Sequence, residues 1–432
     1  MLGPMRGGMD FARGVPFAVS AGRIARCAMA HAYRGSSAGA KDTRCDIEYE
    51  PVMPSPFEHL RAEFPVLARQ IYLNHAGVAP TSTRTAAAVN AWVDDLVHNG
   101  VRNEQQWEAR ASMVRASCAR LVGADASEIA FVRNTSHGLG LVAEGLSWSP
   151  GDEVAVCTAL EYPSNVYPWQ HLADRGVTIS PIEAREGGVT PEAVAAAIGP
   201  RTRLVAVSSA QYATGHRTDL DAIGEVCERA GVLFCVDGIQ TVGCIPVDVK
   251  RSKIHFLSAD SHKWMLGMAG IGFLFVDRSV IDRLRPVLVG WHSTTDAWNF
   301  DRALFDLRRD AQKLEEGSPA YTGIYGMGAA LDILHEAGIE RSSARIAELL
   351  VAADEGLRAL GCHTWPTARD RAGILTFVPP KGSAEALFAE LTAQDFSLSL
   401  RRGRVRISPH LYTRDEEIAA LVEAVGAYVA TT

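Results

Sequence analysis

The stretch Lys253-Ile-His-Phe-Leu-Ser-Ala-Asp-Ser-His-Lys-Trp-Met-Leu-Gly-Met-Ala-Gly-Ile-Gly-Phe-Leu-Phe-Val276 places one lysine, Lys263, between two apolar runs of strand length. A lysine on a turn that faces the core, with no carboxylate beside it in sequence, loses hydration of its ammonium form. Its pKa should therefore fall, and its amine should become a usable nucleophile, as a Schiff-base lysine requires. A surface lysine on an ordinary loop is the simpler interpretation of this stretch alone, and the rest of the chain decides between the two.

The composition is that of an ordinary globular protein. The chain has 432 residues, of which 47% are apolar and 22% charged, so it is long enough for two domains with large cores. Its net charge of -7 argues against nucleic acid or an anionic membrane as the main partner, because both attract basic surfaces. No apolar run reaches the roughly 18 residues that a membrane span needs.

The cysteine pattern predicts a reduced protein without a metal site. The eight cysteines are scattered, with no Cys-x-x-Cys pair and no histidine partner at zinc spacing. Such thiols belong in a reducing compartment, and we expect a cytoplasmic location. Cys157 and Cys235 lie inside apolar runs and should act as small core residues.

The N-terminal residues differ from the rest of the chain. Up to Lys41 there are five arginines and one lysine against a single acid, Asp10. Two interpretations are open: an organelle transit peptide, or a disordered or wrongly included extension with the true start near Met53. The second is favoured, and in either case we expect residues 1–52 to lie outside the fold.

The remainder alternates short apolar runs with helical stretches, which is typical of an α/β protein with a mostly parallel sheet covered on both faces. We expect seven strands in a large domain over residues 53–310, with a first helix at 54–66 that packs on a smaller α+β domain over residues 311–432. The runs read as strands in the large domain are 129–132, 153–157, 177–179, 204–208, 232–236 and the two that flank Lys263. Those in the small domain are 375–378, 397–400 and 405–408.

One polar loop connects a strand to a helix in the large domain. Asn134-Thr-Ser-His-Gly follows the run 129–132, and a parallel sheet places ligands beyond the carboxyl ends of its strands. Hydroxyl groups and free amides at a helix N-terminus form an anion site, so Ser136 and the backbone of His137 could hold a phosphate. Simple capping by Thr135 or Ser136 is the alternative.

Two further strand ends carry residues that suit a charged aromatic ring. A nearly all-apolar strand ends at Asp237, and a carboxylate there needs a cationic partner such as a protonated pyridine nitrogen. Gln240 could reach a hydroxyl of the same ring. Tyr162, in Glu161-Tyr-Pro-Ser-Asn, could stack on the ring face. An Asx turn at Asp237 and ordinary packing of Tyr162 are the alternatives.

Together these residues match one cofactor, pyridoxal 5′-phosphate: an aldehyde for Lys263, a pyridine for Asp237, and a phosphate for Ser136 and His262. From about residue 55 to 430 the chain resembles the class V aminotransferase family of fold-type I enzymes, which includes cysteine desulfurases, isopenicillin N epimerase-like proteins and kynureninase. The matching stretches are Tyr72-Leu-Asn-His-Ala-Gly, Asn134-Thr-Ser-His-Gly, Glu161-Tyr-Pro-Ser-Asn, Val236-Asp-Gly-Ile-Gln, Ser258-Ala-Asp-Ser-His-Lys-Trp and Arg406-Ile-Ser-Pro-His.

The resemblance implies a role for each site residue. Lys263 would form the Schiff base, Asp237 would pair with the ring nitrogen, Gln240 would contact the phenolic oxygen, and Tyr162 would stack on the ring. Ser136, the amide of His137 and His262 would bind the phosphate. The family also implies a homodimer in which Ser318 reaches the neighbour's phosphate. Arg406 would bind the substrate carboxylate, although one of its neighbours, Arg401, Arg402 or Arg404, could have this role instead. Asn165 and His75 would line the entrance.

The same residues serve several reactions at Cα of an amino acid. We place transamination first, with a lyase of the cysteine desulfurase or selenocysteine lyase kind, or an epimerase, as the alternative. A non-catalytic cofactor-binding protein is a third reading, which intact Lys263, Asp237 and Arg406 argue against. Persulfide formation on the protein is disfavoured because no cysteine follows Cys362, whereas one group of desulfurases carries its nucleophile shortly before the position of Arg406.

Overall fold

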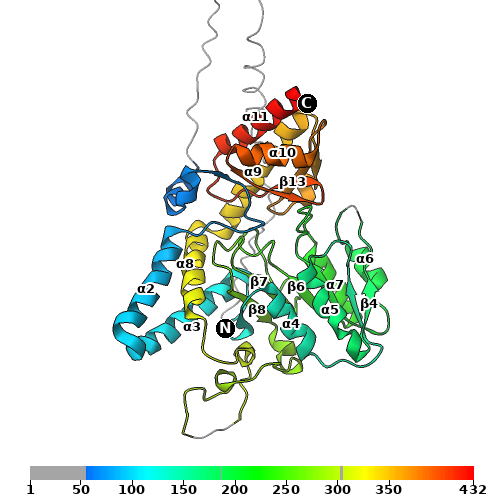
Figure 1. Cartoon of the computed structure of the whole chain (residues 1–432). Coiled ribbons are helices and arrows are strands. Elements are labelled where there is room, and N and C mark those ends of the chain that lie inside the picture. Colours follow the sequence, from blue (N-terminus) through cyan, green and yellow to red (C-terminus); the bar gives the residue numbers. More distant parts are fainter. Residues whose placement is uncertain (1–54, 186, 302–304) are drawn as a thin grey trace, which may run out of the picture. The chain divides into compact units, whose positions relative to one another are not determined.

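The computed structural model describes residues 55–185, 187–301 and 305–432 (Figure 1). The expected N-terminal extension, 1–52, lies outside these ranges. A seven-stranded sheet is the centre of the large domain, in the order β2-β8-β7-β6-β5-β3-β4. The neighbours from β7 to β4 are parallel, and β8 runs antiparallel to both β7 and β2, so the expected mostly parallel sheet is confirmed. The strands are β2 (Ile129–Val132), β3 (Glu153–Val156), β4 (Thr178–Pro181), β5 (Thr202–Ser208), β6 (Leu233–Asp237), β7 (Phe256–Asp260) and β8 (Gly272–Val276).

Helices cover both faces of this sheet, as the nearly all-apolar strands predict. Alternate residues of β6 belong to different core clusters: Phe234 and Val236 pack on one face, Leu233 and Cys235 on the other. Because successive side chains of a strand point to opposite faces, both faces must be buried. The covering helices are α4 (Thr135–Gly145), α5 (Tyr167–His171), α6 (Pro191–Ala197) and α7 (Leu220–Ala230).

Three long helices pack together beside the sheet. They are α2 (Thr83–Asn99), α3 (Glu104–Val122) and α8 (Tyr321–Ala337), blue to yellow in Figure 1. The rings of Trp92, Trp107 and Tyr321 contact one another edge-on or tilted, which joins the three helices. The apolar residues of α8 therefore belong to the core of the large domain, so the packing departs from the expected boundary at 310/311.

The small domain has its own sheet and core. Its sheet has the order β12-β13-β10-β9, and its helices α9, α10 and α11 lie around it (orange to red in Figure 1). The bounds are α9 (Ile339–Ala359), β9 (His363–Trp365), β10 (Leu375–Val378), α10 (Ala384–Ala393), β12 (Ser399–Arg401), β13 (Arg404–Ile407) and α11 (Asp415–Thr431).

The first described residues pack where the two domains meet. In place of a helix over 54–66 there are two short 3-10 helices, η1 (Glu58–Glu63) and η2 (Pro65–Ala68). Arg61 forms a two-pronged ion pair with Glu417 of α11, at 2.9 Å for each nitrogen–oxygen pair, so η1 contacts this C-terminal helix. β1 (Ile71–Tyr72) then pairs in parallel with β11 (Phe396–Ser397).

The other 3-10 helices are η3 (Gly100–Asn103), η4 (Ala126–Glu128), η5 (Pro163–Asn165), η6 (Leu172–Arg175), η7 (Arg278–Arg283), η8 (Trp291–Ser293), η9 (Ala311–Leu314) and η10 (Ala368–Asp370). Within the part of the chain that the structure covers, no helix is both long and apolar enough to traverse a bilayer.

A buried ion pair closes the free edge of the large sheet. Glu315 accepts the backbone N–H of Phe131 in the edge strand β2, at 2.8 Å, and also pairs with the guanidinium of Arg115. Arg115 in turn donates to the carbonyl of Ile129 at 2.8 Å. The exposed fractions of the two side chains are only 7% and 9%, so neither charge has water to replace its partner.

We predict that Glu315→Ala lowers the free energy of unfolding by about 3–5 kcal/mol, because it leaves the Arg115 charge buried without its partner. Urea denaturation followed by tryptophan fluorescence measures this change. The matched control is Glu316→Ala at the neighbouring exposed position, which should shift the free energy by no more than about 0.5 kcal/mol. Equal effects of the two variants would contradict the structural role of the buried pair.

Candidate active site

A cavity of about 360 Å³ opens at the carboxyl ends of β5, β6 and β7, where a parallel sheet is expected to place its ligand. The small domain contributes to its wall through β12 and β13. The lining residues are Ala76, Gly77, Val78, Asn134, Thr135, Ser136, Tyr162, Ser164, Ser208, Ala210, Tyr212, Asp237, Ile239, Gln240, Asp260, His262, Lys263, Arg401 and Arg406.

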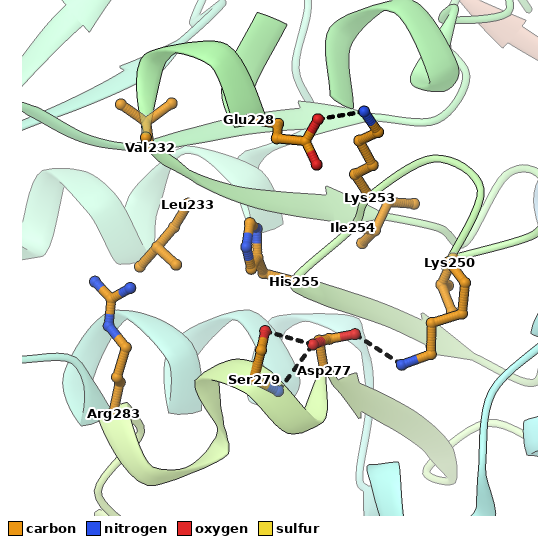
Figure 2. Close-up of a pocket in the computed structure, with 12 residues that line it drawn as sticks. Glu228, Val232, Leu233, Lys250, Lys253, Ile254, His255, Asp277, Ser279 and Arg283 are labelled. Carbon is orange, nitrogen blue, oxygen red and sulfur yellow. Dashed lines mark hydrogen bonds and ion pairs between the residues drawn. The ribbon is translucent and has the colours of Figure 1, made fainter. Parts of the chain in front are cut away.

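A second cavity of the same size, about 360 Å³, lies at the opposite ends of the strands (Figure 2). Two pairs of its charged side chains neutralise each other: Lys253 contacts Glu228, and Lys250 contacts Asp277 at 2.7 Å. Arg283 also lines this cavity, but none of the cofactor-binding residues expected from the sequence does. The first cavity is therefore the candidate active site.

Lys263 lies on the turn that follows β7, and its half-buried side chain lines the cavity. Its Nζ is 5.9 Å from the centroid of the Tyr162 ring. Burial lowers the pKa of Lys263 to about 8; the carboxylate of Asp237 opposes this shift, and the guanidinium of Arg406 adds to it. The lowered pKa expected from the sequence is therefore present, although a nearby carboxylate that the local sequence did not reveal moderates it.

Asp237 is the last residue of β6 and is 3% exposed. Its Oδ1 accepts the N–H of Ile239 at 3.1 Å, so the Asx-type turn considered above is present. Burial raises the pKa of Asp237 to about 6, while the Ile239 amide and Lys263 pull it back. A cation bound beside this carboxylate would stabilise its ionised form, which is what a protonated pyridine nitrogen does.

Gln240 is held by two hydrogen bonds beside the cavity. Its Oε1 accepts the indole N–H of Trp264 at 3.1 Å, and its Nε2 donates to the carbonyl of Ala76 at 3.2 Å. Trp264 directly follows Lys263, so the turn that carries the lysine is fixed to the residue expected to reach the ring hydroxyl. This geometry fits the role inferred for Gln240.

The expected phosphate end forms at the N-terminus of α4. Gly138 allows this helix to pack on β7, because a Cβ there would collide with the Oγ of Ser258. Ser136 Oγ donates to Ser164 Oγ at 2.7 Å, and both serines line the cavity. The cap itself is Asn134, whose Oδ1 accepts the amide of His137 at 2.8 Å, so the capping expected from Thr135 or Ser136 comes from their neighbour.

His262 and His137 differ in their placement. His262 lines the cavity, and its Nδ1 lies 3.0 Å from the Oδ2 of the buried Asp260. The contact has the distance of an ion pair but not the geometry of a hydrogen bond, and it places the imidazole beside Asp260 at the cavity wall. The side chain of His137 does not line the cavity, and its backbone amide is engaged by Asn134. The amide of His137 is therefore a weaker phosphate donor than the sequence suggested.

Arg406 in β13 is 2% exposed and reaches the cavity from the small domain. Its Nε donates to Ser399 Oγ at 3.0 Å and its Nη1 to the carbonyl of Tyr212 at 2.6 Å. Its buried Nη2 has no hydrogen-bond partner among the described residues. Burial, and then Arg401, lower the pKa of Arg406 to about 9. An incompletely paired buried guanidinium fits a site for a substrate carboxylate.

The structure separates the four neighbouring arginines. Arg401 lines the cavity together with Arg406. Arg402 donates to the carbonyl of Ala159 at 2.9 Å, and Arg404 lies over the ring of Trp365 at 4.1 Å from its centroid. Neither of these two lines the cavity. The assignment of the carboxylate-binding role to Arg406 therefore has geometric support that the sequence could not provide.

Two residues expected at the entrance are instead fully buried. His75 has 0% exposure, with its ring between the carbonyl of Ser408 at 2.8 Å and the hydroxyl of Tyr412 at 2.6 Å. Asn165, also at 0%, bridges Glu161 and the indole of Trp169. Neither lines the cavity, because the polar atoms of both side chains are hydrogen-bonded to buried neighbours. This expectation is therefore not met.

Ser318 and four unexpected residues complete the account of the site. Ser318 is exposed in the loop before α8 and does not line the cavity of its own chain, so its proposed contact with a second subunit stays a prediction. The rule that ligands bind at strand ends could have found part of what was missed, since the residues after β5 follow such an end. The polar cavity-lining residues that were missed include Ser164, Ser208, Tyr212 and Asp260.

The comparisons with known proteins agree with this geometry. Residues 71–421 match the family described as aminotransferase class-V. The chain belongs to this family. As a member, it is a pyridoxal 5′-phosphate enzyme of fold-type I, as the motifs predicted, and the residues described above fit that cofactor.

Several relatives carry the name cysteine desulfurase. A probable cysteine desulfurase of Methanothermobacter thermautotrophicus is 30% identical over 85% of this chain and 96% of the relative. An uncharacterised aminotransferase of Bacillus subtilis, YcbU, is 27% identical over 86% and 97%. Among solved structures, a cysteine desulfurase of Thermococcus onnurineus matches with a TM-score of 0.79 and 26% identity, over 88% of this chain and 100% of that one. The cystine C-S lyase C-DES in complex with its reaction product, cysteine persulfide, also matches at 0.79, with 27% identity over 84% and 99%.

We predict that cofactor-free protein reacts with pyridoxal 5′-phosphate at a rate that rises with pH, with its midpoint near pH 8, because only the neutral amine of Lys263 is nucleophilic. Asp237→Asn should move the midpoint to lower pH, since the Asp237 charge holds the pKa of Lys263 up. Growth of the visible absorption band in stopped-flow mixing measures the rate, and Lys263→Ala should show no band. A midpoint near the ordinary lysine value of 10.5 would contradict the assignment.

Proposed function

We propose that the protein is a lyase that removes a sulfur substituent from the β-carbon of an amino acid without forming a persulfide on its own chain. The observation that carries this proposal is the position of the thiols. The six cysteines in the described ranges are all buried and free, and none lines the cavity. They are Cys118, Cys157, Cys227, Cys235, Cys244 and Cys362.

Burial also makes these thiols poor nucleophiles. It raises the pKa of Cys118 to about 12 and that of Cys362 to about 11, and it raises the pKa of the other four thiols as well. The thiolate is the reactive form, and a raised pKa in an apolar environment removes it at neutral pH. Relatives named desulfurase and lyase both support sulfur chemistry, and the lack of a thiol at the described cavity favours the lyase.

The cofactor, when bound, supplies an electron sink for the electrons released at Cα. Asp237 would keep the ring nitrogen protonated by placing a buried carboxylate beside it. Tyr162 would cover one face of the ring, and Gln240 would contact the edge that carries the hydroxyl. Ser136 and His262 would bind the phosphate, with Asp260 beside the imidazole.

Lys263 has two tasks in this proposal. It holds the cofactor until the amino group of the substrate takes its place, and its amine then accepts the proton from Cα. With a pKa near 8, a useful fraction of this amine is neutral at physiological pH. The bond between the β-carbon and sulfur would then break, and the sulfur would leave with the bonding electrons and take up the proton held by Lys263. Hydrolysis of the released 2-aminoacrylate by water would give pyruvate and ammonium.

Arg406 orients the substrate for this proton transfer. Its Nη2 and Nη1 present a fork to the α-carboxylate, while Ser399 and the Tyr212 carbonyl hold the guanidinium in place. Fixing the carboxylate turns the bond between Cα and hydrogen toward Lys263, which lies across the cavity. Transamination, which the family name favoured, would use the same residues and is the alternative outcome of the product analysis below.

We further propose a cytoplasmic homodimer. Free cysteines throughout the described chain suit a reducing compartment. An exposed apolar surface precedes the Ser318 loop and would be covered by a second copy, whose phosphate site Ser318 would then reach. The exposed side chains of this surface are Val287, Leu288, Val289, Trp298, Phe300 and Phe305.

We predict that cystine and other β-thio amino acids give pyruvate, ammonium and a sulfur-bearing product in equal amounts, and that Lys263→Ala gives none. Coupled assays for pyruvate and ammonium, with a sulfide and persulfide assay, measure the products. Cys27→Ser and Cys45→Ser, at the two positions outside the described residues, should retain full activity. Accumulation of a keto acid that retains its β-substituent, with no sulfur release, would instead identify a transaminase.

We predict that Arg406→Lys raises the KM for the amino acid by about 10- to 100-fold, because a lysine loses the two-pronged, charged hydrogen bonds to the carboxylate. Steady-state kinetics measures this change. The control is Arg404→Lys, since Arg404 stacks on Trp365 outside the cavity and its replacement should leave KM unchanged. A KM equal to that of the parent in Arg406→Lys would exclude Arg406 from carboxylate binding.

A further inference from the structure

Glu161 is a buried carboxyl that none of the roles above uses. It lies in the loop between β3 and η5, directly before Tyr162, and is 3% exposed. None of the described lysines, arginines or histidines forms an ion pair with it. A carboxyl group buried without a counter-charge is costly, so its position demands an explanation.

Hydrogen bonds surround both oxygens of this carboxyl group. Oε1 accepts the backbone N–H of Ser208 at 2.8 Å and the side-chain amide of Gln211 at 3.4 Å. Oε2 accepts the amide of Asn165 at 3.0 Å and contacts the hydroxyl of Ser208. The four donor groups belong to Asn165 of η5, to Ser208 at the end of β5 and to Gln211 in the loop that follows, so Glu161 joins the loop after β3 to the loop after β5.

The two joined loops carry opposite sides of the candidate active site. Tyr162, beside Glu161, covers the place of the cofactor ring. In the other loop Tyr212 gives its carbonyl to Arg406 at 2.6 Å. The Tyr162 and Tyr212 rings meet edge-on at 5.2 Å between centroids. The carboxyl group of Glu161 therefore fixes the position of Tyr162. It also fixes the loop whose Tyr212 carbonyl supports Arg406.

Glu161 is also electrostatically coupled to the ring site. Ser208, its main partner, is aligned with Asp237 across β5 and β6. Burial raises the pKa of Glu161 to about 7, against its hydrogen bonds and with a contribution from Asp237. The other titratable or charged groups around this loop are Cys157, at the end of β3, and Arg402, which holds the carbonyl of Ala159.

We propose that Glu161 is a positioning residue that ties Tyr162 to the Tyr212 loop, and that cofactor binding at Asp237 promotes its ionisation. This rests on the proposed function only in that the cofactor ring carries a positive charge beside Asp237. Such a charge favours the ionised form of Glu161, so cofactor binding releases a proton from it. Ionised Glu161 in return strengthens cofactor binding.

The test compares Glu161→Gln and Glu161→Asp with the parent protein, using Glu225→Gln on the exposed face of α7 as control. Spectroscopic titration with pyridoxal 5′-phosphate from pH 5.5 to 8.5 gives the dissociation constant. The ratio of this constant in Glu161→Gln to that in the parent should rise with pH, by about tenfold for each unit by which the cofactor shifts the pKa of Glu161. Glu161→Asp keeps the charge but cannot span both loops, so it should bind the cofactor more weakly and retain the pH dependence.

A second arm uses cofactor-free protein. The raised pKa of Glu161 means that its protonated form favours the fold, so its stabilising contribution is present below the unfolded value of 4.5 and is lost as pH rises through about 7. The thermal midpoint of Glu161→Gln, relative to the parent, should therefore increase between these pH values. Should Glu161→Gln fail to fold, Ser208→Ala is the substitute, because it removes one hydrogen bond that lowers the pKa of Glu161. The pH at which the thermal midpoint falls should then be higher in Ser208→Ala than in the parent.

The outcomes distinguish this inference from the proposed reaction. A ratio of dissociation constants that is flat with pH, together with a flat difference in thermal midpoint, overturns the linkage. An unchanged dissociation constant in Glu161→Asp overturns the positioning role. Products of transamination with the expected pH dependence would remove the lyase proposal and leave the role of Glu161 standing. Failure of the parent to bind the cofactor would remove both the proposed function and the linkage.

Discussion

The structure depends on one electrostatic constraint, which is that Asp237 and Lys263 line the same cavity, where burial removes part of their hydration. Burial disfavours the charged form of each group, and their mutual attraction favours it. Burial is the larger effect, so the pKa of Asp237 is raised and that of Lys263 is lowered. Without a ligand, the attraction between the two groups does not offset the cost of burying their charges. A ligand with a cationic ring nitrogen for the aspartate and a carbonyl for the amine resolves both costs at once, and this explains why the two residues occupy neighbouring strand ends.

The lysine turn is anchored to both domains. The side chain of Trp264 packs in the core of the small domain, while its indole N–H donates to Gln240 of the large domain. His410, from the small domain, contacts the carbonyl of Trp264 at 3.2 Å. Arg406 also connects the two domains: it belongs to the small domain, and its guanidinium donates to the Tyr212 carbonyl of the large domain. Cofactor and substrate contacts are thus set by how the two cores meet.

The sequence predicts the residues that depend on local rules and misses those that depend on distant packing. Asp237, Lys263 and Ser136 lie at a strand end or within four residues after one, and the position of a strand end is visible in a short apolar run. The burial of His75 depends on Ser408 and Tyr412, more than 300 residues away, and was not visible. The arginines near 401–406 were ambiguous because Arg402 and Gly403 form a tight hairpin turn with positive φ angles of 49° and 69°, which decides which side chains face the cavity.

The residues that act at Cα do not by themselves select a reaction. Lys263, Asp237 and Arg406 serve transamination, epimerisation and elimination equally, because all three begin with loss of the same proton. Selection must come from what the cavity offers beyond Cα. There the described wall presents Tyr212 and Arg401, and no thiol. A sulfur that leaves the β-carbon would meet a phenol and a cation that stabilise an anionic leaving group, and no cysteine of the described residues that could keep it on the protein. The sulfur would therefore depart as a free product.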